Sequence, residues 1–161
     1  MSPTDGIAYR PTPDGFVVSA STRSVTGHLY CLTLAAWIAV VAANPAMWPR
    51  WNAFLPLLLG MTLLQATAAA IGVFGRVEVR RTGNIGSLFA GVGDAGITRR
   101  FDWRELRAIL EGHTIFRNGF GARRKVIVFE FKPGTRKTLR FGATLPATRR
   151  EALLELLRQL A

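Results

Sequence analysis

Residues 25–43 read VTGHLYCLTLAAWIAVVAA and residues 53–74 read AFLPLLLGMTLLQATAAAIGVF, and these two runs decide the fold of the chain. Neither run contains Asp, Glu, Lys or Arg. Each is close to the ~20 apolar residues that a helix needs to cross the hydrocarbon layer of a membrane. The connector, residues 44–52, holds two Pro, two Trp and Arg50, which is typical of a turn at a membrane interface. The two runs therefore predict a transmembrane hairpin over residues 25–75.

Charge is segregated along the chain. The 161 residues hold 21 Lys and Arg against 10 Asp and Glu, a net charge of +11, yet the mean hydropathy is +0.21. Residues 76–161 hold 18 of the basic and 8 of the acidic residues, a net charge of +10. We interpret this contrast as an apolar anchor joined to a basic, water-exposed domain. One cysteine and two histidines exclude a disulfide framework and a structural zinc site.

Arginines near the ends of the two runs predict the orientation of the hairpin. Two lie on the N-terminal flank and three follow the second run directly, whereas the connector holds only Arg50. Because basic residues accumulate on the cytoplasmic side, both termini are expected in the cytoplasm, with the hairpin in the inner membrane of a bacterium.

Small residues recur every four positions in both runs and favour close helix packing in lipid. One strongly polar side chain lies inside the second run and is expected to donate or accept a structural hydrogen bond. The candidate packing residues are Ala35, Ala39, Ala43, Gln65, Ala68 and Gly72.

Beyond residue 74 the apolar segments are short and are separated by turn residues. Alternation predicts a strand over residues 76–81, and β-branched and aromatic residues predict another over 125–132, with a partner at 138–141. If residues 96–103 are extended, Ile97, Phe101 and Trp103 share one face. Residues 104–110 fit either a helix or a strand.

The chain ends in a predicted helix, residues 147–160. Thr148 and Glu151 have the spacing of a capping box, and Pro146 suits the lead-in to a first turn. An apolar stripe of helical spacing follows, formed by Leu153, Leu156, Leu157 and Leu160.

The order of these elements resembles that of the bacterial pleckstrin-homology-like (bPH) membrane proteins. The residues that carry the resemblance are FDWRELRAI at 101–109, the predicted hairpin of 126–131 with 139–141, and the leucine-rich helix. The resemblance covers residues 25–161. It implies a membrane α-hairpin of two transmembrane helices plus an α+β PH-like domain, a small antiparallel β-barrel or sandwich capped by the C-terminal helix. The expected divisions are a polar N-terminal segment, 1–24, the hairpin, 25–75, and the PH-like domain, 76–161.

No catalytic residue, metal ligand or cofactor is expected. Most acidic residues lie beside an arginine, as Asp102 does between Arg100 and Arg104, which favours surface ion pairs over acid–base chemistry. The bPH resemblance likewise implies a binding platform rather than an enzyme.

Basic residues around the predicted hairpin turns are the remaining functional signal. We predict contact with anionic lipid headgroups or a protein partner, although charge on a solvated face would give the same pattern. Nucleic acid is disfavoured because the basic run lacks stacking aromatics. The candidates are Arg99, Arg100, Arg123, Arg124, Lys125, Lys132, Arg136, Lys137 and Arg140.

The sequence thus predicts a non-enzymatic, membrane-anchored binding or scaffold module. The alternative is an accessory or assembly subunit of a larger inner-membrane complex, with the hairpin itself as the interface.

Overall fold

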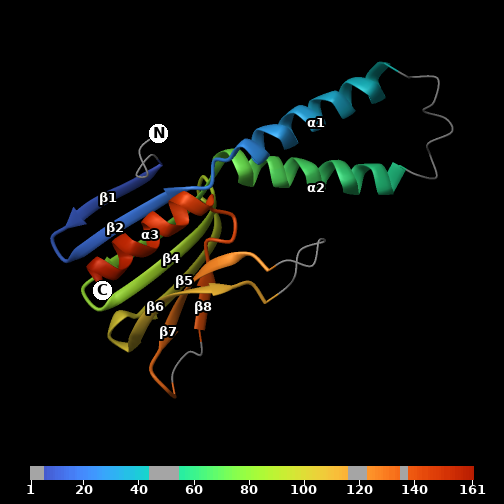
Figure 1. The fold of residues 1–161 in the computed structure, drawn as a ribbon. Coiled ribbons are helices and arrows are strands. Elements are labelled where there is room, and N and C mark those ends of the chain that lie inside the picture. The colour runs from blue at the N-terminus through green and yellow to red at the C-terminus, as the bar shows by residue number, and fades with distance from the viewer. Residues whose placement is uncertain (1–5, 44–54, 116–122, 135–137) are drawn as a thin grey trace.

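The computed structural model describes residues 6–43, 55–115, 123–134 and 138–161, and in them the chain forms two antiparallel sheets and three α-helices (Figure 1). The first five strands are β1 (Ile7–Thr12), β2 (Gly15–Ser21), β3 (Gly75–Thr82), β4 (Ile85–Val92) and β5 (Ala95–Asp102). The last three are β6 (Leu106–His113), β7 (Lys125–Phe131) and β8 (Thr138–Phe141). The helices are α1 (Val25–Ala43), α2 (Leu55–Phe74) and α3 (Ala147–Leu160).

The first sheet has five strands in the order β1-β2-β3-β4-β5. It combines the two strands that precede α1 with the three strands that follow α2. Strand β2 precedes α1, yet it pairs with β3, which follows α2, so that Val18 lies opposite Val79. On β2 the alternate residues Phe16, Val18 and Ala20 are buried, as expected for a strand with one face on a core. The polar composition of residues 1–24 did not reveal these strands.

The second sheet has the order β6-β7-β8 and contains the predicted strands over 125–132 and 138–141. Those strands and the strand predicted over 76–81 are confirmed. Residues 104–110 contain the end of a 3-10 turn, Trp103–Glu105, and then most of β6. The predicted shared face of 96–103 is wrong at Ile97, which is 65% exposed, whereas Phe101 and Trp103 are buried.

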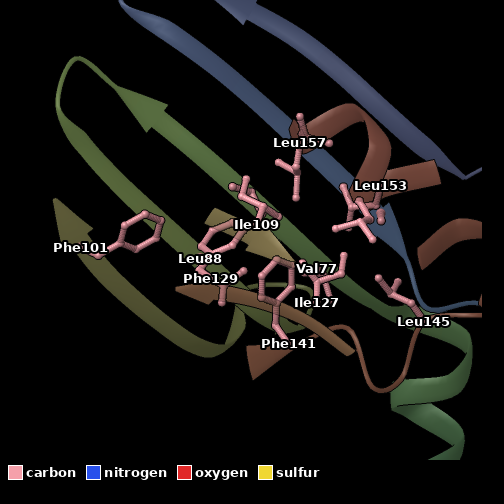
Figure 2. Close-up of a cluster of buried hydrophobic side chains, with 14 of the residues drawn as sticks. Val77, Leu88, Phe101, Ile109, Ile127, Phe129, Phe141, Leu145, Leu153 and Leu157 are labelled. Carbon is pink, nitrogen blue, oxygen red and sulfur yellow. The ribbon is translucent and has the colours of Figure 1, made fainter. Parts of the chain in front are cut away.

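Helix α3 covers the space between the two sheets and completes the core. Leu153 and Leu157 are fully buried and lie over Ile109 and Phe129 (Figure 2). The predicted stripe is confirmed for these two leucines, while Leu156 and Leu160 are only partly buried. The predicted capping box is wrong, because Pro146 is the N-cap residue and no side chain of the described residues caps the helix.

Helices α1 and α2, which we call the helical arm, project from one end of the five-stranded sheet (Figure 1). At the base of the arm Gly27 packs directly on Gly72. Thr22 Oγ1 donates a hydrogen bond to the Ile71 carbonyl, and Ser24 N donates to the Gly72 carbonyl at 3.0 Å. We call the two sheets together with α3 the body.

The predicted architecture of a two-span membrane hairpin followed by a PH-like domain is wrong. Among the described residues one helix, Val25–Ala43, is long and apolar enough to cross a membrane, and the apolar portion of α2, Leu59–Phe74, is shorter than a span. The strands form two separate sheets, and no closed barrel is present in the described residues. The physical reason is that the N-terminal strands enlarge the first sheet, so the body begins before the helices. The predicted connector, residues 44–52, lies outside the described residues.

Candidate functional site

The predicted basic residues do not form one cluster. Arg124 and Lys125 lie at the arm-facing end of β7, Arg140 lies on β8, and Lys132 follows the other end of β7. Arg99 and Arg100 are both exposed on β5 and, as neighbours on a strand, point to opposite faces. Arg136 and Lys137 lie outside the described residues.

A groove separates the base of the helical arm from the body, and we call it the junction groove. Its volume is about 600 Å³. The start of α1, the last turn of α2, the start of β7 and the loop before α3 line it. The charged side chains that line it among the described residues are Arg124, Lys125 and Arg150.

Arg150 is the residue of this groove that the sequence analysis missed. It lies in the first turns of α3, is 8% exposed, and its Nε has no hydrogen-bond partner among the described residues. One signal was present in the sequence. Arg150 is three residues before Leu153 and seven before Leu157, so it falls on the apolar stripe that faces the core.

An ion pair holds one of the groove's cations in place. Lys125 Nζ lies 2.7 Å from Glu111 Oε1, which joins β7 to β6. The Lys125 hydrogen bond lowers the pKa of Glu111 below its ordinary value, and the electrostatic effect of Lys125 and Arg150 adds to this shift. Desolvation of the carboxyl opposes the shift. Glu111 therefore remains an anion beside the groove at neutral pH.

Two smaller grooves share Arg140. In one, of about 430 Å³, Arg140 and Arg123 line the wall, and Arg140 Nη1 donates to the His113 carbonyl at 3.0 Å. In the other, of about 530 Å³, Arg140 lies with Arg99 between β8 and β5. The structure thus brings together Arg123, Arg140 and Arg99 on one side of the body, and Arg124 and Lys125 at the junction groove.

The predicted polar contact within the arm is present. Gln65 Nε2 donates to Thr33 Oγ1 at 2.6 Å, and a second bond runs from Trp37 Nε1 to Thr62 Oγ1 at 3.2 Å. Of the predicted small residues, Gly72 packs on α1, and Ala68 is partly buried beside the junction groove. The remaining three are exposed: Ala35, Ala39 and Ala43.

The described residues hold no group of three His, Cys, Asp or Glu side chains placed to bind a metal ion. The charged side chains that line the junction groove in the described residues are cations, so the groove offers recognition by positive charge and hydrogen-bond donors. In comparisons with protein-family models, curated proteins and solved structures, nothing matches this chain.

Proposed function

We propose that this chain is a membrane-attached, non-enzymatic binding module. The apolar surface of the helical arm contacts lipid, with α1 as the one described helix long enough to cross a membrane, and the body presents its basic grooves to anionic headgroups or to a protein partner at the membrane surface. The observation that carries the proposal is the apolar surface that the arm exposes.

Many large apolar side chains of the arm are exposed, although α1 and α2 pack on each other. Leu32 is 67% exposed and Leu63 is 70% exposed, and only 6% of the residues in the most apolar part of α1 are buried. Exposing such a surface to water costs about 25 cal/mol per Å². A core helix of a soluble domain would be largely buried, so the low burial of α1 favours a lipid or protein environment.

The topology of the body supports attachment from one side of a membrane. Strand β2 leads into α1 and β3 leaves α2, and these two strands are hydrogen-bonded neighbours. The N-terminal strands and the rest of the body therefore lie on the same side of any lipid layer that the arm enters. The net charge of +10 on residues 76–161 favours the anionic cytoplasmic face, where each Lys or Arg near the surface gains about 1 kcal/mol.

Membrane fractionation of the full chain tests the attachment. We expect the protein to remain in the membrane pellet after washing with alkaline carbonate. The variant L63R, which places a charge on the apolar surface of α2, is expected to be released from the pellet, whereas L63A and T82R are expected to stay. Release of the unaltered protein into the supernatant would contradict the proposal.

A second candidate function is that of a subunit whose arm packs against another membrane protein. It is favoured by the exposure of Ala35, Ala39 and Ala43 on α1, because small residues at this spacing allow a second helix to approach closely in lipid. Purification in mild detergent at high salt discriminates the two functions. A stoichiometric partner that is lost in the variant A39L supports the subunit, and a protein purified alone supports the binding module.

A further inference from the structure

We propose that the junction groove binds a phosphate group, with Arg150, Arg124 and Lys125 as its cationic ligands. The proposal rests on the proposed membrane attachment only for the source of the phosphate, which is a lipid headgroup if the arm lies in lipid and a soluble phosphate if it does not.

Arg150 supplies the main argument. A buried guanidinium is desolvated, and a buried N–H donor without a partner adds a further penalty, so such groups are normally paired. Arg150 is more than nine-tenths buried and lines the groove, and its Nε is unpartnered in the described chain. The Nε atom is itself enclosed, so an acceptor held by the Arg150 side chain in the groove would relieve this penalty only by reaching Nε.

The charge balance of the groove favours an anion of more than one charge. Arg124, Lys125 and Arg150 contribute three positive charges, and Glu111 is the carboxylate that pairs with Lys125 from the neighbouring strand. Glu111 also lies in the field of Arg150 and of His113. One carboxylate leaves about two positive charges uncompensated, and a phosphate carries one to two negative charges. Arginine guanidinium groups match phosphate oxygens in geometry as well as in charge.

Two helices begin at the groove, which adds positive potential to it. Ser24 and Pro146, the residues just before α1 and α3, both line the wall. Ser24 Oγ accepts a hydrogen bond from Gly27 N at 3.1 Å, while among the described residues no side chain caps α3. The positive ends of both helix dipoles are thus directed to the region where the phosphate would lie.

The position of the groove is suited to a headgroup. It lies where the helical arm leaves the body, and Tyr30 and Ile71 of the arm form part of its wall. A lipid whose acyl chains run along the arm would therefore have its phosphate at the level of Arg124 and Arg150.

NMR spectroscopy of the full chain in maltoside micelles tests the proposal, since this detergent carries no phosphate. The ¹⁵N–¹H signal of Arg150 Nε, assigned with the variant R150K, reports directly on a new acceptor. Inorganic phosphate is added in one titration and a short-chain phosphatidic acid in the other. We expect the signal to move saturably with at least one of them, and the one that saturates it identifies the source of the phosphate.

Variants of matched charge complete the test. R124Q is expected to raise the apparent Kd by about tenfold. R104Q, which removes a charge beside β6 at the far end of the body, is expected to leave it unchanged. An Arg150 signal that moves with neither probe, or equal weakening by R124Q and R104Q, would overturn the proposal. Because the titration is done in micelles, its outcome is independent of carbonate extraction, so a failure of membrane attachment is distinguishable from a failure of phosphate binding.

Discussion

Gly27 of α1 and Gly72 of α2 let the two helices touch at the base of the arm. A Cβ atom added to Gly27 would lie 2.4 Å from the Gly72 carbonyl carbon, which is far inside contact distance. The two helices cannot easily move apart at this point, because Thr22 and Ser24, just before α1, donate hydrogen bonds to carbonyl groups in the last turn of α2. The residue pair therefore sets how closely the helices approach.

Substitution of this glycine tests its role against a matched control in α2. G27A is expected to destabilise the folded chain by about 1–3 kcal/mol, the usual cost of overpacking. G60A adds the same methyl group where nothing lies within 4 Å, and it is expected to be neutral or stabilising. Thermal unfolding in detergent measures both variants, and equal effects of G27A and G60A would contradict this account of the arm.

The ion pair of Lys125 and Glu111 gives a prediction for pH. Since the folded state lowers the pKa of Glu111, the pair's contribution to stability is present above the ordinary glutamate pKa and is lost as pH falls through the lowered value. In K125Q the Glu111 pKa is expected to rise toward its ordinary value, as measured by ¹³C NMR of the carboxyl. K132Q, at the other end of β7, is the control, and a shift in K132Q as large as that in K125Q would argue against the pair.

At the scale of the element, the spacing of apolar residues predicted helices and strands well where a single helical or strand period was dominant. The α1 bounds, the β7 strand and the α3 stripe all follow from composition and spacing. The faces were harder to predict. Between Leu106 and Ala108 the register of β6 shifts, so Ile109 is buried while Leu110 is exposed. A β-bulge reverses the alternation of buried and exposed side chains along the strand. The residue pattern of the sequence does not predict where the bulge lies.

Strand β2 shows why part of the fold was missed. Its residues Gly15–Ser21 contain short apolar and polar alternation, but the partner, β3, lies beyond the entire helical arm. Long-range pairing of this kind leaves no local signal. The N-terminal segment is therefore part of the core, although its composition is that of a polar lead-in.

A pair of substitutions in β2 tests this role. Val18 is fully buried, and V18S is expected to cost about 3 kcal/mol through lost apolar burial and an unpaired hydroxyl. Val17, which faces the other side of the sheet and is only half-buried, provides the control V17S, with an expected cost under about 1 kcal/mol. Chemical denaturation measures the free energy of unfolding of both variants. If V18S cost no more than V17S, β2 would not be part of the stable core.

At the scale of the whole molecule, charge segregation indicated two physical environments, but it did not predict how the parts connect. The apolar runs form a helical arm inserted into a sheet, rather than an anchor placed before an independent domain. This arrangement places the junction groove between the arm and the basic end of β7. Arg150 contributes to that groove only because α3 folds back over the sheets, which a linear reading of the basic residues does not show.

The central claim of the proposal is that the apolar surface of the helical arm contacts lipid while the body lies in water. The one cysteine, Cys31, is exposed on α1 and takes a nitroxide spin label without further change to the chain. A label on T82C, in a C31A background, reports on the body. In reconstituted vesicles the account predicts that the Cys31 label collides with oxygen and is protected from a water-soluble nickel chelate, with the reverse at Thr82. Equal access of the nickel chelate to both labels would contradict it.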